Sequence, residues 1–274
     1  MDKILNDSYY TLDKLVVEFC MRTEDAQRIM DKLGCMINVN PSRSNMRAVC
    51  HYQYNIDLDN GNSFWIGFEP NWKKFDGYVK YGRVEFNPAK VSEDLQFQSL
   101  YGELMSCVSC GFAKGVRFDL AIDMPIARDR VHMMWDNRLH GEIGLGLKDR
   151  TQYLGRKHNH GYIKLYNKAL ELGLKDMDLT RLELTVDYKT RSFENVQRIV
   201  PKMYIMDSFQ LPLGINGTDK LLIIAVLSDF NLLKELPHTK RKKIEGYLAN
   251  TLLSLELDIK KYNQVLDYIN TFIK

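Results

Sequence analysis

Gly161-Tyr162-Ile163-Lys164-Leu165-Tyr166-Asn167-Lys168 alternates between apolar and polar side chains. Successive residues of a β-strand point to opposite sides, so this alternation predicts a strand with one face toward a core. Ile163 and Leu165 would pack into that core. The other face would carry two phenols and two ammonium groups, from Tyr162, Lys164, Tyr166 and Lys168.

A face with phenols and ammonium groups can support phosphate chemistry. A phenolate oxygen is a nucleophile, and ammonium groups beside it lower the pKa of the phenol and bind phosphate. On an isolated strand, the simpler interpretation is an amphipathic strand with a solvated face. Two further strands with the same design favour the chemical interpretation.

These two segments each combine an apolar face with a charged one. In residues 116–123 the charged face carries Asp119 and Asp123, and in residues 180–189 it carries Arg181 and Glu183. Carboxylate oxygens are suitable ligands for Mg²⁺ or Mn²⁺, and a bound metal ion polarises a phosphate. We therefore predict a metal site formed by Asp119, Asp123 and Glu183. Arg181 and Glu183 could instead form structural cross-strand ion pairs with neighbouring residues.

The charged faces together predict a reaction. A tyrosine near the metal would attack a phosphodiester, and Lys164, Lys168 and Arg181 would stabilise charge on the phosphoryl oxygens. The phosphodiester energy is retained in the new phosphotyrosine bond, so a strand end can later reverse the step. Such a protein would nick and rejoin DNA without ATP.

The remaining pattern predicts an α+β fold. The first hundred residues are expected to form β-α-β-β-β-α, with a helix from Thr23 to Gly34 and a hairpin turn at Asp59-Asn60-Gly61. Further strands follow to residue 189. Helices are predicted at 193–206, interrupted at Pro201, and at 218–236 and 239–273, separated by Pro237. We expect a central, largely antiparallel sheet with helices on one face in residues 1–210, and a helical C-terminal region, 211–274, packed on it.

Charge is concentrated locally. The net charge is only +3, but residues 148–168 contain six Lys or Arg residues and one acid. A DNA-binding face would therefore be local. The predicted DNA contacts are Arg117, Arg150, Arg156, Lys157, Tyr162, Lys240 and Arg241. The run Lys240–Lys243 fits a phosphate contact and a solvated helix end equally well.

Other features exclude some classes of protein. The chain starts without a basic-then-apolar leader, and its longest apolar run, Leu221 to Leu227, is too short to span a bilayer. Five scattered cysteines fit a reducing compartment. We therefore expect a cytoplasmic protein with no membrane partner. Cys107 and Cys110 have no second pair, which favours packing over a zinc site.

Four ordered motifs resemble the Rep_trans family of plasmid rolling-circle replication initiators and the related relaxases of integrative conjugative elements. They are Phe118–Asp123, Tyr153–Lys157, Tyr162–Lys168 and Thr180–Thr185, with weaker support from Tyr81–Pro88. The resemblance covers residues 116 to 188. It implies a nickase built around an antiparallel sheet, with Tyr166 as nucleophile and the acidic residues as metal ligands.

The expected function is that of a sequence-specific, metal-dependent DNA nickase and strand transferase. Tyr166 would become linked to the 5′ phosphate, leaving a 3′ hydroxyl for a polymerase. Expected partners are the double-stranded origin, a single-stranded nick site, a host helicase and polymerase, and, as in many family members, a second copy of the chain. The alternatives are a conjugative relaxase, a non-catalytic origin-binding protein and a phosphodiesterase that needs no tyrosine.

Several assignments within the site have rivals. Tyr162 shares the face of Tyr166 and could be the nucleophile or a stacking residue, while Tyr153 and Tyr188 are weaker candidates. His158 and His160 fit a turn better than a metal site, and Glu142 fits either the metal shell or the surface. Single-stranded DNA could stack on a tryptophan, although a core position suits these residues as well. The three tryptophans are Trp65, Trp72 and Trp135.

Overall fold

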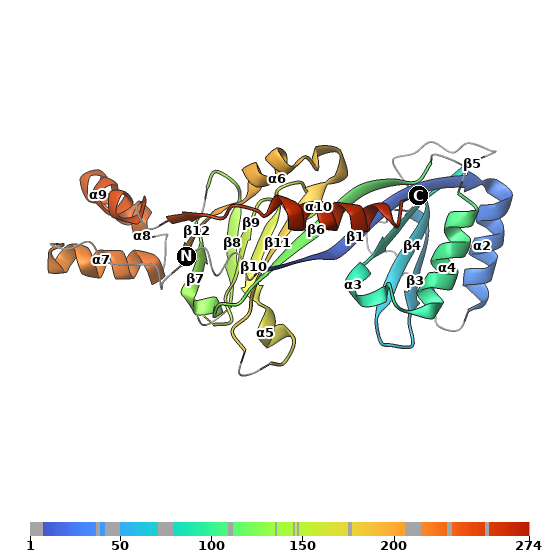
Figure 1. Cartoon of the computed structure of the whole chain (residues 1–274), viewed down its shortest axis with the longest axis horizontal. Coiled ribbons are helices and arrows are strands. Elements are labelled where there is room, and N and C mark those ends of the chain that lie inside the picture. Colours follow the sequence, from blue (N-terminus) through green and yellow to red (C-terminus); the bar gives the residue numbers. More distant parts are fainter. Residues whose placement is uncertain are drawn as a thin grey trace. The chain divides into compact units, whose positions relative to one another are not determined.

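The chain forms two compact units in the computed structural model (Figure 1). The N-terminal unit comprises Thr11–Leu120, Val186–Arg191 and Lys260–Lys274, and the Tyr166 unit comprises Met1–Tyr10, Ala121–Thr185 and Ser192–Ile259. The structure describes residues 8–36, 39–41, 50–70, 79–108, 112–134, 136–144, 146, 148–174, 177–205, 215–228, 232–249 and 252–273.

The N-terminal unit is built on an antiparallel sheet in the order β2-β3-β4-β5-β1-β6. The strands are β1 (Tyr9–Arg22), β2 (Val39–Pro41), β3 (Cys50–Asp57), β4 (Ser63–Pro70), β5 (Val79–Phe86) and β6 (Lys114–Met124). Its helices are α2 (Thr23–Cys35), α3 (Pro88–Val91), α4 (Leu95–Ser106) and α10 (Ile259–Asn270), with a short 3-10 turn, η2 (Tyr188–Thr190). The predicted hairpin is formed by β3 and β4.

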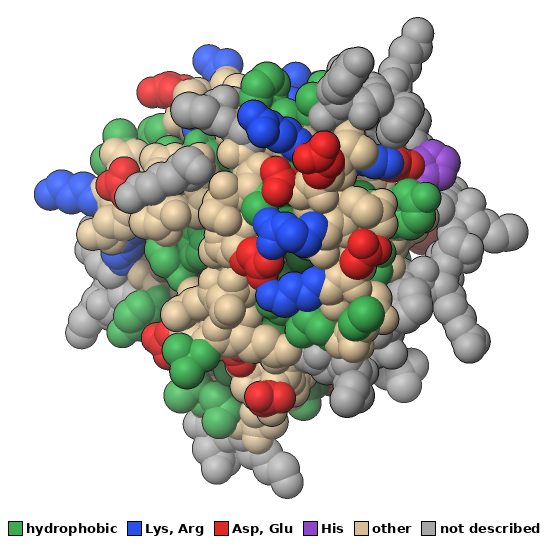
Figure 2. All heavy atoms as spheres, turned by 90° about the vertical axis from the view of Figure 1, so that its right-hand side faces the viewer, with side chains coloured by type: hydrophobic (Ala, Val, Ile, Leu, Met, Phe, Trp, Pro, Cys, Tyr) green, Lys and Arg blue, Asp and Glu red, His purple; other side chains and the backbone are tan. Residues whose placement is uncertain are grey.

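Helices α2 and α4 lie side by side against this sheet (Figure 1). Helix α2 buries Ala26, Ile29, Met30 and Leu33, the spacing of one helical face. The helix starts at Thr23, as predicted, and Arg22 is at the cap position without a side-chain bond. On the outer side, Glu103 of α4 pairs with cations of α2. Figure 2 shows acids and bases interspersed on this side, without a patch of one sign.

The Tyr166 unit contains a second run of antiparallel strands, in the order β6-β11-β10-β9-β8. They are β8 (His140–Ile143), β9 (Thr151–Leu154), β10 (Ile163–Asn167) and β11 (Thr180–Asp187), which follow the end of β6. A smaller sheet joins β7 (Val131–Met133), β12 (Lys202–Ile205) and β13 (Leu252–Ser254), and η1 (Arg128–Arg130) precedes β7. The α+β class and the large antiparallel sheet are therefore as predicted.

The helices of this unit are shorter than expected. They are α5 (Lys168–Glu171), α6 (Phe193–Ile199), α7 (Gly217–Ser228), α8 (Leu232–Glu235) and α9 (His238–Ala249). The predicted helix 193–206 ends at Ile199, just before the expected interruption at Pro201, and the helix expected after that proline was wrong because β12 follows. The predicted helix 239–273 is interrupted by β13. There Leu255 and Leu257 are buried around exposed Glu256, a period of two that favours extended chain.

No helix in the described part of the chain is long and apolar enough to cross a membrane.

A buried polar network connects β7, β8 and β9. Gln152 accepts from the Met133 N–H at 2.9 Å and from Arg128 Nη2 at 3.0 Å, and it donates to Glu142 at 2.8 Å. Arg128 is 2% exposed, and its neighbour His132 is 1% exposed. Burial, followed by the charge of Arg128, lowers the pKa of His132 to about 4.

His132 should make the protein sensitive to acid. Its pKa is depressed in the folded state, so between its ordinary value and about 4 the unfolded chain binds more protons. We expect the free energy of unfolding to fall as pH drops from 7 toward 4, by up to about 3 kcal/mol from this residue. Urea unfolding of wild type and His132→Gln across that range measures the effect. A variant with an unchanged pH slope would contradict it.

Candidate active site

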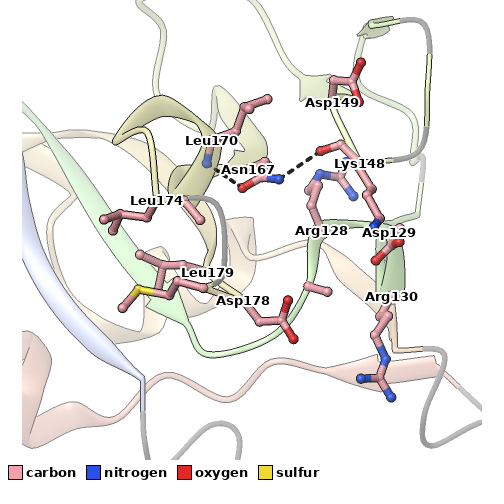
Figure 3. A pocket seen from close by; sticks show the side chains of 13 residues that line it. Arg128, Asp129, Arg130, Lys148, Asp149, Asn167, Leu170, Leu174, Asp178 and Leu179 are labelled. Carbon is pink, nitrogen blue, oxygen red and sulfur yellow. Dashed lines mark hydrogen bonds between the residues drawn. The ribbon is translucent and has the colours of Figure 1, made fainter.

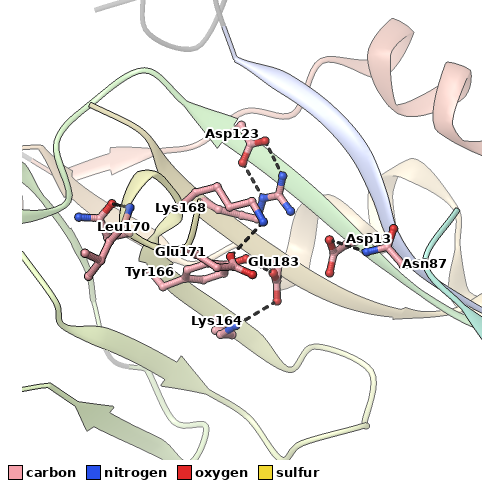
Figure 4. Close-up of polar contacts among 11 residues, drawn as sticks. Asp13, Asn87, Asp123, Lys164, Tyr166, Lys168, Leu170, Glu171 and Glu183 are labelled. Carbon is pink, nitrogen blue, oxygen red and sulfur yellow. Dashed lines mark hydrogen bonds and ion pairs between the residues drawn. The ribbon is translucent and has the colours of Figure 1, made fainter. Parts of the chain in front are cut away.

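The strand register brings the predicted catalytic residues onto one face of the Tyr166 unit. On β10 and β11, Lys164 lies opposite Glu183 and Tyr166 lies opposite Arg181. Directly opposed residues of antiparallel strands share a face, and residues two apart on one strand do as well. These four side chains therefore lie together, with Asp123 of β6 reaching the group through Arg181 (Figure 4).

The hydroxyl of Tyr166 donates a hydrogen bond to Glu183 Oε1 at 2.6 Å. The phenol ring lies beneath Lys164, whose Nζ is 3.8 Å from the ring centroid, and Lys168 Nζ is 6.0 Å from the same point. Tyr166 is 6% exposed. The residue is thus held at both ends, by a carboxylate at its oxygen and by ammonium groups at its ring.

The environment of Tyr166 keeps its proton on. Burial, and then the negative charge of Glu183, raise the pKa of the phenol far above its ordinary value. We expected the flanking lysines to lower this pKa, and that was wrong. Lys164 lies over the ring rather than beside the oxygen, where the carboxylate is. A nucleophilic Tyr166 would therefore need a base, and Glu183 is in place to act as one.

Arg181 and Asp123 form a buried two-point ion pair. Arg181 Nε and Nη2 each approach an oxygen of Asp123 at 2.6 Å, and the two residues are 7% and 9% exposed. The alternative interpretation, cross-strand ion pairs with neighbouring residues, is confirmed for Arg181, whose partner Asp123 lies on β6. The ion-pair partner across from Glu183 is Lys164, at 3.8 Å.

The predicted metal ligands are engaged by protein groups. Arg181 binds both oxygens of Asp123, and Tyr166 binds Oε1 of Glu183. Asp119 is half-buried on β6, four residues before Asp123, and belongs to the N-terminal unit. Within the described ranges, no group of three or more His, Cys, Asp or Glu residues is placed to hold a metal ion. This arrangement does not fit a bound ion, and the Mg²⁺ or Mn²⁺ site stays a prediction.

Lys168 and Asn167 fix the start of α5. Asn167 accepts from the Leu170 N–H at 2.9 Å and donates to the Lys148 carbonyl at 3.1 Å. Lys168 is buried and pairs with Glu171 at 2.9 Å. Burial would raise the pKa of Glu171, but the hydrogen bonds from Lys168 and Tyr166 and the charges of Lys168 and Lys164 together lower it. Sequence reasoning missed Glu171, although its three-residue spacing from Lys168 is a recognisable helical pair.

The predicted DNA contacts of residues 117–162 are in varied settings. Arg156 and Lys157 are exposed in the turn after β9, whereas Arg150 pairs with Glu142 at 3.5 Å. Tyr162 stacks on Tyr153, with ring centroids 6.2 Å apart. Arg117 is half-buried on β6 of the N-terminal unit. Arg156 and Lys157 are thus the most accessible of this set.

The two DNA contacts predicted in α9 have partners within the helical region. Lys240 Nζ is 2.9 Å from the fully buried Asp219, which Lys243 also binds at 2.7 Å. Arg241 donates to the carbonyls of Lys234 at 2.9 Å and Leu236 at 3.3 Å. These bonds tie α9 to α7 and to the end of α8, so a DNA role for Lys240 or Arg241 would be additional to a structural one.

The other sequence candidates add little to the site. Trp65 is half-buried on β4, and Tyr188 lies in η2 of the N-terminal unit. His158 and His160 lie in the turn between β9 and β10, where His158 has a φ of 70°. Three candidates, Trp72, Trp135 and Cys110, lie outside the described residues.

Removing one member of the Arg181–Asp123 pair should destabilise the fold strongly. Asp123→Asn would leave the guanidinium buried without its counter-charge, and we expect a loss of about 3 to 5 kcal/mol in unfolding free energy. Asp123→Leu combined with Arg181→Met should lose much less than the two single changes together. Urea unfolding of wild type, Asp123→Leu, Arg181→Met and the double variant measures this coupling. Additive losses would show that the two side chains are independent.

No protein-family model matches the chain, and no curated protein is significantly similar to it. A solved structure of a rolling circle replication initiator protein from Geobacillus stearothermophilus is similar, with a TM-score of 0.41 and 16% sequence identity. The similarity covers 81% of this chain and 85% of that chain. At this level the similarity does not carry a function across. The side chains of the Tyr166 unit are therefore the basis on which a function can be inferred.

Proposed function

We propose that the chain is a plasmid rolling-circle replication initiator, a DNA nickase and strand transferase that attaches the cut strand to Tyr166. The observation that carries the proposal is the Tyr166 hydroxyl, which donates to the Glu183 carboxylate at 2.6 Å beside two lysines. A phenol bound to a carboxylate and surrounded by cations is equipped to attack a phosphodiester.

The proposed step forms one bond, breaks one bond and transfers two protons. The Tyr166 oxygen attacks the phosphorus while Glu183 takes its proton, so a phosphotyrosine O–P bond forms. The bond from phosphorus to the 3′ oxygen breaks, and that oxygen takes a proton from solvent. The products are a 5′-phosphotyrosyl strand and a free 3′ hydroxyl, and reversal of the step rejoins a strand.

Lys164 is the cation best placed to meet the phosphate. Its side chain is 31% exposed, against 7% for Lys168 and 9% for Arg181. The two buried cations already neutralise Glu171 and Asp123. We therefore assign direct phosphate contact to Lys164, and a longer-range electrostatic role to Lys168 and Arg181.

The proposal includes Mg²⁺ or Mn²⁺, but no step is assigned to the ion. Acidic oxygens from Asp119, Asp123 and Glu183 are chemically suitable ligands. Two of these carboxylates are occupied by Arg181 and Tyr166, so binding would require those contacts to open.

The partners follow from the reaction. DNA would be bound as a double-stranded origin and as a single-stranded nick site, with Arg156 and Lys157 exposed for phosphate contact. A host helicase and polymerase would extend the 3′ hydroxyl, and a homodimer and a cytoplasmic location complete the proposal. A conjugative relaxase would use the same chemistry at a transfer origin.

One observation favours a second candidate, a non-catalytic origin-binding protein. Tyr166 is 6% exposed, and its hydroxyl is already hydrogen-bonded. A nucleophile must reach its phosphate, so the active form would have to expose this oxygen. A protein that keeps Tyr166 covered would bind origin DNA without forming a covalent product.

Covalent labelling separates the two candidates. Protein is incubated with Mn²⁺ and a radiolabelled single-stranded oligonucleotide from the origin, then run on a denaturing gel. We expect wild type to become labelled and Tyr166→Phe to lose the label, because the phenol oxygen forms the bond. Tyr162→Phe, directly before the same strand, is the matched control and should be labelled. Origin binding without a labelled band would support the non-catalytic candidate.

Glu183→Gln tests the base. The amide can still accept a hydrogen bond from Tyr166 but cannot hold its proton, so we expect the labelling rate to fall by about 10² to 10⁴. The same assay at rising pH should partly restore the variant, because hydroxide replaces the missing base. A variant as fast as wild type would remove Glu183 from the mechanism.

Chelation tests whether covalent labelling requires a divalent metal ion. If a divalent ion is needed, EDTA should abolish labelling, and Mn²⁺ or Mg²⁺ should restore it. Equal labelling with and without EDTA would show that the cations of the protein are sufficient.

A further inference from the structure

A pocket of about 540 Å³ lies beside α5 in the Tyr166 unit (Figure 3). Its volume is in the range of sites that enclose small molecules or parts of larger ones. Figure 3 shows two unlike walls, with Leu174 and Leu179 on one side and Arg128, Asp129 and Lys148 on the other. This pocket takes no part in the reaction described above.

The charges around the pocket are balanced. Its described lining contains three cations and three carboxylates, from Arg128, Arg130, Lys148, Asp129, Asp149 and Asp178. A phosphate site would have an excess of positive charge. A lining that offers both donors and acceptors without a net charge fits an uncharged polar group that has both, and a nucleobase edge is such a group.

The opposite wall is apolar and open to solvent. Leu170 is 61% exposed, Leu174 is 42% exposed and Met177 is 53% exposed, and all three line the pocket. Large apolar side chains gathered at the mouth of a polar pocket are typical of a binding site. A flat base could lie against this wall while its edge faces the charged one.

Buried polar groups fix the charged wall. Arg128 is 2% exposed, with Nη2 on Gln152 at 3.0 Å and Nη1 on the Val131 carbonyl at 2.5 Å. Its Nε–H is buried and has no hydrogen-bond partner within the described chain. An unpaired buried donor is costly, and a carbonyl acceptor from a ligand would satisfy it.

The pocket is adjacent to Tyr166 along the chain. Asn167, the next residue, lines the pocket, and successive strand residues point to opposite sides. In α5, Lys168 and Glu171 pair near Tyr166, while Leu170 lines the pocket. Helix α5 therefore separates the proposed nucleophile from the pocket by the thickness of one element.

We propose that this pocket holds an unpaired base of the single-stranded DNA, a short distance along the strand from the phosphate that Tyr166 attacks. The inference rests on the proposed function for its choice of ligand. Leu174 and Met177 would pack on the face of the base, and Asp178 and Lys148 would meet its edge. The pocket would position the scissile phosphate by holding a neighbouring nucleotide.

Binding to two matched probes tests the pocket. One is a short fluorescent single strand of mixed sequence, and the other is the same backbone with abasic residues throughout. We expect Leu174→Ala/Met177→Ala to bind the base-containing strand about tenfold more weakly than wild type, because the apolar wall is lost. Binding of the abasic strand should not change. Leu172→Ala, 54% exposed and outside the lining, is the control and should match wild type on both probes.

Three results would overturn the inference. They are equal affinity of wild type for the two probes, an unchanged double variant, and equal weakening of both probes. A shift in oligomeric state of the double variant, seen by light scattering, with unchanged DNA binding would assign the wall to protein contact instead.

The labelling assay separates this inference from the proposed function. Labelling of Tyr166, together with equal affinity for the base-containing and abasic strands, would support the nickase and contradict a base-binding pocket. The opposite result is also possible: wild type is not labelled, but it prefers the base-containing strand and the double variant loses that preference. This would support a base-binding pocket in a DNA-binding protein that does not nick.

Discussion

The hydrogen bond between the Tyr166 hydroxyl and Glu183 is the constraint around which the Tyr166 unit is arranged. It keeps the phenol protonated and aimed at a carboxylate. The buried pair of Arg181 and Asp123 occupies the same sheet face, and Lys164 covers the ring. Buried charges are costly unless each has its partner, so the geometry of the group is tightly specified.

The side chains at the end of β10 face two different environments. On one side of β10, Tyr166 lies among charged pairs, and on the other, Asn167 begins α5 and lines a pocket. A reactive phosphate and a neighbouring nucleotide would thus be held by adjacent residues of one rigid strand. Such placement fixes orientation without a moving part, which suits a reaction whose rate depends on alignment.

The sequence was enough to predict which side chains share a strand face, but not which of them form ion pairs with one another. Alternation in β10 and β11 placed Lys164, Tyr166, Arg181 and Glu183 correctly on one face, because a period of two allows only two faces. Which cation meets which carboxylate depends on side-chain reach, so the ion pair of Arg181 with Asp123 was not foreseen. The strands β12 and β13 were missed because short apolar alternation inside helical surroundings is ambiguous.

The central claim is that the Tyr166 oxygen becomes bonded to a DNA phosphate. Mass spectrometry of the protein, digested with nuclease and protease after reaction with origin DNA, tests it most directly. The account predicts a nucleotide mass added to the peptide that contains Tyr166, located on that side chain by fragmentation. A modified peptide carrying the mass on Tyr162, Tyr153 or Tyr188 would contradict it.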